Sequence, residues 1–303
     1  MTLLDLELVD QSRMLQVSAV PLKPEFEPYR LVKLTDSHKV EVLQFLNSRP
    51  VHTVAMASFL NDNGFESRFN RGIYFGYRAP DGKLEGVALI GHTTLIEART
   101  REALAAFAAA ARESETAIHL MMSEGSAIEH FWDLYSAGAI SPRQILVEKL
   151  FELNFPYLVQ DCPWEIEIGD ESQLQEIVEA HAEVAVIETG VNPLEEDPDG
   201  FTERCRRRIQ QGRTFVATEN GKLLFKADIV AETDDVIYLE GVYVSPEARG
   251  KGVGPKCLAK LSIALLDRVS NICMLSNEKF DSVHRSFELA GYHTTDTCTT
   301  IVV

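Results

Sequence analysis

The chain has 303 residues, of which 45% are hydrophobic and 25% charged; this is the composition of a globular protein with about two domains. No apolar run approaches the ~18–20 residues of a membrane-spanning helix, and the acidic start MTLLDLELVD is not typical of a signal peptide. The formal net charge of −17 disfavours nucleic acid and anionic membranes as partners and favours a cationic substrate, although such a charge can also serve solubility alone.

The cysteines indicate a reducing environment. They are odd in number, scattered and without CxxC spacing: Cys162, Cys205, Cys257, Cys273 and Cys298. This pattern argues against a disulfide framework and against a zinc or other metal site. We therefore expect reduced thiols and a cytoplasmic protein.

The first 27 residues have weak periodicity and a proline-rich end, which predicts an irregular arm over residues 1–27. Two passages with one shared pattern follow. YRLVKLTDSHKVEVLQFL, from Tyr29, predicts a strand, an Asp36 N-cap and an amphipathic helix; WEIEIGDESQLQEIVEAH, from Trp164, predicts the same with Asp170 as the cap.

Each passage leads into the same series of elements. A hairpin is predicted at Asp81-Gly82 and at Asn220-Gly221, because glycine accepts the positive φ of such turns. A helix (REALAAFAAAAR, PKCLAKLSIALLDR), a short apolar strand (AIHLMM, NICMLS) and a last helix ending in Ala-Gly come next. We therefore predict an α/β fold with a mixed α+β sheet, built as two copies of one unit over residues 28–158 and 159–303.

The segment VIYLEGVYVSPEARGKGVGPKCLAKL carries the clearest functional signal. It predicts a strand over Val236–Val244, a turn, and a glycine-rich loop that opens a helix reaching about Arg268. The loop residues are Arg249, Gly250, Lys251, Gly252, Val253 and Gly254. Backbone N–H groups at such a helix N-terminus suit a pyrophosphate, and the two basic residues add positive charge.

In its context, the spacing R-x-x-G-x-G after V-x-x-S-P-E resembles the GNAT superfamily of N-acyltransferases over roughly residues 164–302. The resemblance implies that the loop binds the pyrophosphate of acetyl-CoA or another acyl-CoA. The order of elements does not fit a Rossmann fingerprint, and Gly-Pro stands where a P-loop needs Gly-Lys-Ser/Thr. Pro255 removes one N–H from the first helical turn, where proline is tolerated, so altered phosphate contacts are expected.

The end of the domain also resembles the family, with one departure. Asn277 ends the penultimate strand, where the resemblance implies contact with the pantetheine arm. Val283, Phe287, Gly291 and Tyr292 follow the A-x-x-x-Y-x-x-x-G-F signature, but Phe287 replaces the tyrosine that often protonates the departing thiolate. His284 is a candidate substitute acid; a packing or surface role is the alternative, and a thiolate can also leave without a dedicated acid.

Glu240 is the candidate base. A carboxylate within an apolar strand is costly unless it is paired or functional, and many relatives carry a carboxylate near this position, so Glu240 is either a general base or a structural hydrogen-bonding residue. The resemblance also assigns Val242, Tyr243 and Val244 to acyl-CoA binding, with the N–H of Val242 or Val244 donating to the thioester oxygen.

The segment between the first two helices of this unit lines the acceptor site in the family. It carries acids that could attract a cation or simply form a solvated loop: Glu188, Glu195, Glu196, Asp197 and Asp199. Four nearby arginines form a solvated helix face or contribute one contact to the 3′-phosphate of CoA: Arg204, Arg206, Arg207 and Arg208.

The first unit lacks a glycine between Gly91 and Gly125, where its own phosphate loop would lie. We interpret residues 28–158 as a degenerate GNAT-like domain that packs on the second and shapes its acceptor site. Its histidines show no metal or triad spacing: His52, His92, His119 and His130.

The sequence therefore predicts direct transfer of an acetyl or similar acyl group from acyl-CoA to an amine, in a small cationic molecule or a protein lysine, without a metal. Two alternatives stay open: an acyl-CoA-binding sensor or regulatory module, which Phe287 favours, and a scaffold whose duplicated fold binds a partner.

Overall fold

The computed structural model describes residues 26–155 and 161–303. Residues 1–25, and with them most of the predicted arm over 1–27, lie outside the described residues, as do residues 156–160. The first half and the second half below are the described residues before and after that second gap.

The first half contains these helices and strands: β1 (Leu31–Lys33), α1 (Lys39–Leu46), α2 (Pro50–Asn63), β2 (Gly72–Arg78), β3 (Leu84–Gly91), β4 (Thr93–Ala98), α3 (Arg101–Arg112), β5 (Leu120–Glu124), α4 (Gly125–Ser136) and β6 (Gln144–Asn154). The second half contains these: β7 (Glu167–Ile168), α5 (Leu174–Thr189), α6 (Pro193–Glu196), α7 (Pro198–Gln210), β8 (Thr214–Glu219), β9 (Lys222–Glu232), β10 (Val236–Val244), α8 (Val253–Leu266), β11 (Asn271–Asn277), α9 (Asp281–Leu289) and β12 (His293–Val302). Short 3-10 helices cover Pro28–Arg30, Asp36–His38, Arg68–Asn70, Glu171–Gln173 and Pro246–Ala248.

The local predictions agree with most of these bounds. The predicted strand Val236–Val244 is β10, and the turn Asn220-Gly221 joins β8 to β9 with both residues at positive φ. Asp170 is an N-cap and accepts from the backbone N–H of Ser172 at 2.7 Å. The predicted cap at Asp36 is wrong, because Thr35 occupies the N-cap position there and forms a capping box with the side chain three residues on.

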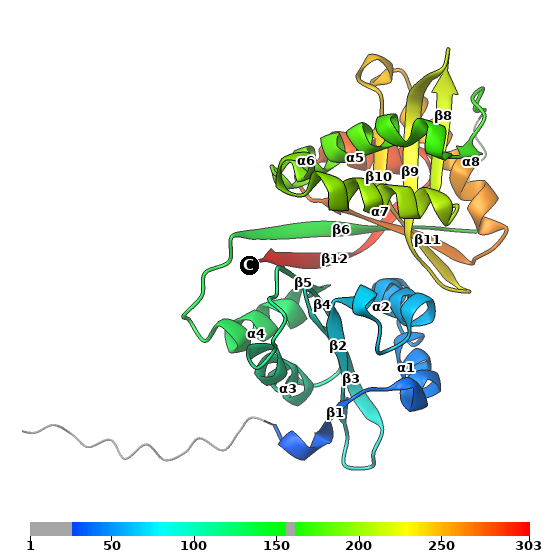
Figure 1. Cartoon of the computed structure of the whole chain (residues 1–303). Coiled ribbons are helices and arrows are strands. Elements are labelled where there is room, and N and C mark those ends of the chain that lie inside the picture. The colour runs from blue at the N-terminus through cyan, green and yellow to red at the C-terminus, as the bar shows by residue number, and fades with distance from the viewer. Residues whose placement is uncertain (1–25, 156–160) are drawn as a thin grey trace, which may run out of the picture.

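All these strands belong to one mixed sheet, in the order β1-β2-β3-β4-β5-β12-β6-β11-β10-β9-β8-β7 (Figure 1). The two halves exchange their last strands at its centre. β6 of the first half pairs antiparallel with β11 of the second, and β12 of the second pairs antiparallel with β5 of the first. Each half therefore completes the sheet of the other.

The register reveals an internal two-fold relation. β6 and β12 pair with each other through the centre of the sheet, where Glu148 is opposite Cys298. β4 pairs in parallel with β5 only as far as Leu95, and β10 pairs in parallel with β11 only as far as Tyr238. Glu97 and Glu240, each two residues beyond that point, are therefore counterparts in the two halves.

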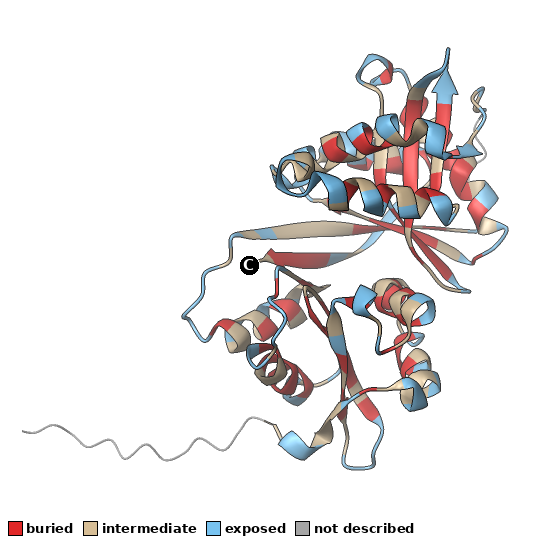
Figure 2. Ribbon diagram, in the orientation of Figure 1, coloured by how far each residue is buried: buried red, intermediate tan, exposed pale blue. Residues whose placement is uncertain are grey.

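Helices cover both faces of the sheet, and the buried residues lie mainly on its strands and on the sides of the helices that face it (Figure 2). In the second half, α8 and α9 pack on one face and α5 and α7 on the other. α2 of the first half also packs on β9 and β10, where Val54 joins Tyr238 in one cluster. The two halves are thus connected through the helical layer as well as through the sheet.

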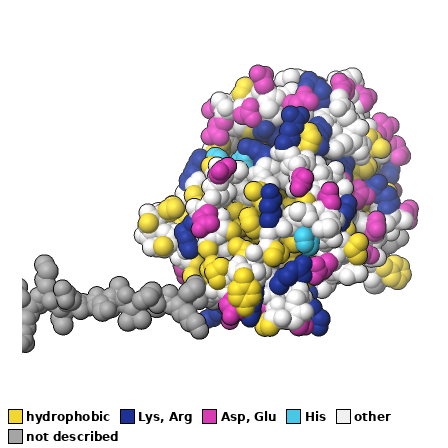
Figure 3. All heavy atoms as spheres, turned by 60° about the horizontal axis from the view of Figure 1, so that its bottom comes forward, with side chains coloured by type: hydrophobic (Ala, Val, Ile, Leu, Met, Phe, Trp, Pro, Cys, Tyr) yellow, Lys and Arg dark blue, Asp and Glu magenta, His cyan; other side chains and the backbone are white. Residues whose placement is uncertain are grey.

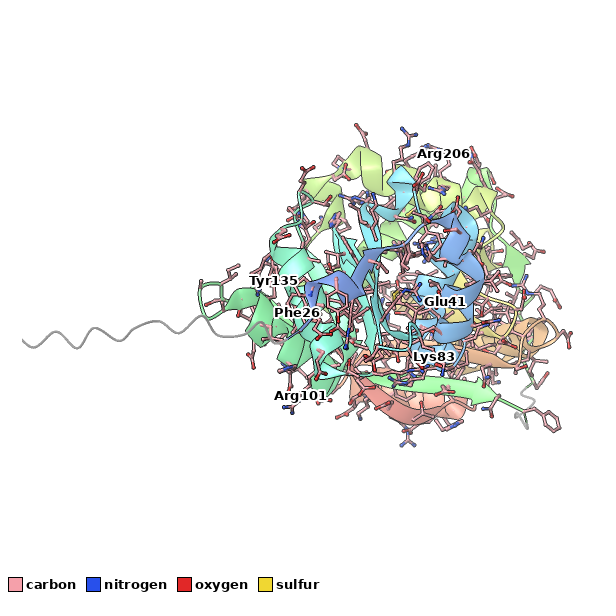
Figure 4. The ribbon with its side chains drawn as sticks, turned by 90° about the horizontal axis from the view of Figure 1, so that it is seen from below. Phe26, Glu41, Lys83, Arg101, Tyr135 and Arg206 are labelled. Atoms are coloured by element: carbon pink, nitrogen blue, oxygen red, sulfur yellow. The ribbon has the colours of Figure 1, made fainter. Side chains whose placement is uncertain are left out.

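Around the first-half sheet, α3 and α4 cover one face and α1 and α2 the other. Phe26 and Tyr135 pack against the α3–α4 cluster, and Glu41, on the α1 side, forms a two-point ion pair with Arg78 at 2.7 and 2.8 Å (Figure 4). On the face shown in Figure 3, hydrophobic side chains gather near the middle and charges of both signs are interspersed around them.

Candidate active site

A cleft of about 730 Å³ opens where β10 and β11 stop pairing. Past Tyr238 the two strands diverge, so that the end of β10, including Glu240 and Val242–Val244, faces the space beside Met274–Ser276. β6, α5, α8 and α9 supply the remaining walls. The cleft is therefore a consequence of a parallel strand pair that separates at its carboxyl end.

The glycine-rich loop forms one end of this cleft. Gly250 and Gly252 have φ of +74° and +79°, a conformation that L side chains rarely adopt, and Gly252 is the N-cap of α8. Within residues 26–155 and 161–303, no side chain caps α8. The first N–H groups of the helix are consequently available to an anion, apart from the one that Pro255 lacks.

The two basic loop residues differ in their surroundings. Arg249 lines the cleft; its Nε donates to the carbonyl of Val244 at 3.0 Å, and its guanidinium pairs with Glu183 at 2.5 Å and lies 5.7 Å from the centre of the Tyr243 ring. Lys251 is exposed and is not among the residues that line the cleft. Arg249 is thus oriented by protein contacts before any phosphate arrives.

Three carboxylates line the other part of the cleft: Glu148 on β6, Glu188 at the end of α5 and Glu240 on β10. Shielding from water, and then the charges of Glu240 and Glu148, raise the pKa of Glu188 to about 7. Burial likewise raises the pKa of Glu148, with a further contribution from Glu240. Among the described residues, none of the three forms an ion pair with a basic side chain.

A β-bulge places Glu240 and Val242. Between Glu240 and Tyr243, β10 has one residue more than β9, and Gly241 takes a φ of +59°. Beneath the bulge, the Nζ of Lys226 donates to the carbonyl of Gly241 at 3.2 Å and pairs with Asp228. The bulge leaves the N–H of Val242 outside the paired register, as an oxyanion donor requires.

The charged groups beneath the bulge are almost completely buried. Lys226 is 0% and Asp228 1% exposed, and Asp228 also pairs with Arg208 at 3.1 Å. Although burial opposes it, the pairing with these cations holds the pKa of Asp228 well below its usual range. His181 lies 3.2 Å from the Nζ of Lys226, and burial together with that cation lowers the pKa of its ring to about 3. A neutral imidazole therefore completes the network.

Comparison with known proteins agrees with this geometry. The sequence model described as Acetyltransferase (GNAT) family matches residues 176–287, from α5 through the glycine loop to α9. This segment is a GNAT acetyltransferase domain. No curated protein matches the chain.

Solved structures extend the likeness of fold to both halves. A GNAT-family acetyltransferase from Colwellia psychrerythraea is 12% identical, with 90% of this chain and 98% of that chain covered and a TM-score of 0.54. A Drosophila protein is also 12% identical, with 90% and 98% covered and a TM-score of 0.67. A tandem GNAT protein from the clavulanic acid biosynthesis pathway is 14% identical, with 90% and 97% covered and a TM-score of 0.54. The predicted α/β fold of two tandem GNAT-like units is confirmed.

Within the GNAT domain, several predicted acyl-CoA residues share the cleft: Val242, Tyr243, Val244, Arg249, Gly250, Gly252, Val253, Gly254 and Phe287. Phe287 is buried, and its ring meets those of Phe151 and Tyr292. Tyr292, the next aromatic residue, is no substitute acid, because its buried hydroxyl is bonded to Ser262 at 2.6 Å.

Besides Lys251, two predicted residues of the domain lie outside the lining. The Oδ1 of Asn277 accepts from the backbone N–H of Lys279 at 3.0 Å, and its neighbour Ser276 faces the cleft instead. His284 is 4% exposed, and its Nε2 lies 2.9 Å from the carbonyl oxygen of Asn277. The direct pantetheine contact of Asn277 and the acid role of His284 stay predictions, and His284 is placed to fix the end of β11.

The first half has a different arrangement at the matching position. The side chain of Thr100 caps α3 by accepting from the N–H of Ala103 at 3.2 Å, so the N-terminus of α3 is already occupied. The cavity between the halves there has a volume of only about 40 Å³. Glu97, the counterpart of Glu240, is buried and pairs with Arg49 at 3.3 Å. That this half is a degenerate unit stays a prediction.

Sequence reasoning missed Glu148 and the Lys226–Asp228 pair. The pair has a signal, because two charged residues at i and i+2 in the apolar run LLFKADIVA must lie on one buried face. Glu148 has no such signal in the sequence, because only the exchange of strands brings it to this cleft. The described residues contain no group of three His, Cys, Asp or Glu side chains that could hold a metal ion, and no helix among them is long and apolar enough to span a membrane.

Proposed function

We propose that the protein is an N-acyltransferase that transfers an acetyl or similar acyl group from acyl-CoA directly to a primary amine. The observation that carries the proposal is one continuous cleft that joins the uncapped N-terminus of α8 to the carboxylates of Glu188 and Glu240. The first feature suits a pyrophosphate and the second suits an amine. A GNAT domain at residues 176–287 supports the same assignment.

The reaction follows from these groups. An alkylamine with a pKa of ~10.4 is protonated at neutral pH and must lose a proton before it attacks. Glu188, with its pKa near 7, and Glu240 beside it are the proposed acceptors of that proton. The amine nitrogen then forms a bond to the thioester carbon, and the N–H of Val242 donates to the developing oxyanion. The nitrogen gives its second proton to the other carboxylate of the pair, and the C–S bond breaks to release CoA thiolate and the neutral amide.

The thiolate departs into a cleft wall that holds Phe287 in place of a donor. A thiol with a pKa near ~8.5 is a tolerable leaving group without a dedicated acid. Phe287 also keeps the alternative open that the cleft binds acyl-CoA as a non-catalytic sensor.

Calorimetric titration with acetyl-CoA, followed by an assay for thiol release with a panel of amines, tests the proposal. We expect binding by the wild type and none by a folded Gly252→Asp, Gly254→Asp variant. Gly212→Ala is the matched control, because Gly212 also has a positive φ and open space around it but does not line the cleft. Binding with thiol release in the presence of amine supports transfer. Binding without release, with every amine tested, supports the sensor.

A further inference from the structure

The strand exchange gives the first half a residue in the cleft of the second. Glu148 lies on β6, opposite Asn277 of β11 and Cys298 of β12, and it lines the cleft together with Glu240. The hydroxyl of Thr300 donates to its Oε2 at 2.6 Å. The carboxylate is thus held in a defined orientation by the exchanged pair of strands.

No ion pair among the described residues neutralises the three carboxylates at this end of the cleft. Glu148 and Glu188 each interact with Glu240, from strands and a helix on three sides. In the described part of the chain, two basic side chains line the cleft: Arg249 is already paired with Glu183, and Arg285, on α9, is exposed and forms no ion pair with the three carboxylates. Neighbouring like charges repel one another unless a cation enters, so the site favours a positively charged ligand.

The first half shows how this chain satisfies the counterpart position. Glu97, at the place of Glu240, pairs with the guanidinium of Arg49 at 3.3 Å. The same guanidinium also pairs with Glu124 at 2.6 Å. One internal cation thus bridges two carboxylates beside the small cavity between the halves. In the cleft of the second half, no basic side chain among the described residues forms an ion pair with Glu148, Glu188 or Glu240, and the place is left to a ligand.

We propose that Glu148 is a specificity-determining residue that selects a small aliphatic amine carrying a second positive charge. The inference rests on the proposed transferase function and deepens it. One amine of the acceptor loses its proton to Glu188 or Glu240 and attacks the thioester. The other amine stays protonated and is held by Glu148. A monoamine leaves that carboxylate without a cationic partner and gains less from binding.

Acceptors of matched length test the proposal: 1,4-diaminobutane, n-butylamine and 4-aminobutan-1-ol, each with saturating acetyl-CoA. We expect kcat/KM for the diamine to exceed that for either monoamine by about tenfold or more, which corresponds to ~1.4 kcal/mol. Glu148→Gln keeps an oxygen that accepts from Thr300 but removes the charge. It should raise KM for the diamine about tenfold. The two monoamines should change by a smaller factor that is the same for both, because loss of the Glu148 charge also lowers the pKa of Glu188.

The control is Glu152→Gln. Glu152 lies on the same strand and accepts from a β12 hydroxyl, that of Thr295, at 2.5 Å, but it does not line the cleft. This variant should keep the wild-type preference. Calorimetric binding of the diamine to the protein loaded with CoA gives a second readout that needs no turnover; Glu148→Gln should weaken it by a similar factor.

The outcomes separate the two proposals. If acetyl-CoA binds but no amine is acylated, the transferase function fails. If amines are acylated and the wild type shows no preference for the diamine, or if Glu148→Gln retains the preference, the role of Glu148 is overturned while the transferase function stands. Tighter binding of the diamine that is lost in Glu148→Gln and kept in Glu152→Gln supports the inference.

Discussion

Replacing Lys226 by methionine should destabilise the fold and slow the reaction through one cause, the loss of the buried cation beneath the β10 bulge. The ammonium group is 0% exposed, pairs with Asp228, and holds the carbonyl of Gly241 at 3.2 Å. Methionine is similar in length and apolar, so the substitution removes the charge while it preserves most of the packing.

The size of the effect follows from what Asp228 retains. Removal of one partner from a buried ion pair costs about 3–5 kcal/mol, because a buried charge is left uncompensated. Arg208 still pairs with Asp228 at 3.1 Å and Thr214 still donates to it at 2.8 Å. We therefore expect the lower end of the range, about 3 kcal/mol in the free energy of unfolding at pH 7. A domain with ordinary stability of ~5–15 kcal/mol remains folded after such a loss.

The double variant Lys226→Met, Asp228→Asn isolates the charge effect. Asparagine can still accept from Thr214, but it removes the negative charge that pairs with both Lys226 and Arg208. If the reasoning is correct, the double variant loses less stability than the sum of the losses of Lys226→Met and Asp228→Asn alone, because both substitutions break the same ion pair and are strongly coupled. Urea denaturation followed by fluorescence measures both differences. Additive losses, or a loss below ~1 kcal/mol for Lys226→Met, would refute an account based on buried charge.

The same substitution should alter catalysis more than acyl-CoA binding. Without the hydrogen bond from Lys226, the carbonyl of Gly241 is no longer held in place. The two groups on either side of Gly241, the carboxylate of Glu240 and the N–H of Val242, then lose their fixed positions as well. The glycine loop at the other end of the cleft is unaffected. We expect kcat of Lys226→Met to fall by at least tenfold, with the dissociation constant for acetyl-CoA within about twofold of the wild-type value; tenfold in rate corresponds to ~1.4 kcal/mol. Equal losses in both would contradict a local role for Lys226.

Three further predictions concern the loop, the acceptor carboxylates and the first half. Gly252→Ala forces a side chain into a left-handed conformation at the N-cap of α8. Because that conformation costs ~1–2 kcal/mol, the substitution should weaken acetyl-CoA binding by about tenfold or more in calorimetry. Unchanged affinity would contradict the assignment of the loop to phosphate binding. The pH profile of kcat/KM should contain an apparent pKa near 7 from Glu188, and Glu240→Gln should shift this pKa to a lower value by removing a neighbouring negative charge. If the apparent pKa near 7 is unchanged in Glu188→Gln, Glu188 is excluded as the group that causes it. Arg49→Met leaves the buried Glu97 unpaired. Burial already raises the pKa of Glu97, so the native state binds more protons than the unfolded state, and the loss of stability should grow as the pH rises from 5 to 8. A loss independent of pH in denaturation curves would argue against this pairing.

The sequence predicted those elements that local chemistry determines. The strand Val236–Val244, the Asn220-Gly221 turn and the Asp170 cap depend on neighbouring residues, and each is confirmed. The Asp36 cap failed because Thr35 offered a competing capping box with His38 one position earlier. Such competition between adjacent polar residues is decided by backbone geometry that composition does not reveal.

The acceptor end of the cleft could be predicted only in part. Glu240 and Glu188 belong to the segment that resembles the family, and the sequence identified both as candidates. Glu148 lies about ninety residues before Glu240 along the chain, in a strand of alternating polar and apolar residues that has no feature typical of a binding site. Its role depends on which strands become neighbours in the sheet, and register across halves is a tertiary property.

The exchange of β6 and β12 also predicts how the protein unfolds. β11 loses its antiparallel partner along its whole length if the first half unfolds, and β5 loses its own if the second half does. Each half would then expose an unpaired strand edge beside its core. Trp132 packs in the α3–α4 cluster and Trp164 against the α8–α9 cluster, so single-tryptophan variants report on each half separately. We expect the fluorescence midpoint in urea to coincide with the circular dichroism midpoint of the same variant, both for Trp132→Phe and for Trp164→Phe. Midpoints within one variant that differ by more than ~0.5 M, about 1 kcal/mol at ordinary m values, would mean that the halves are stable apart and that the shared sheet does not couple them.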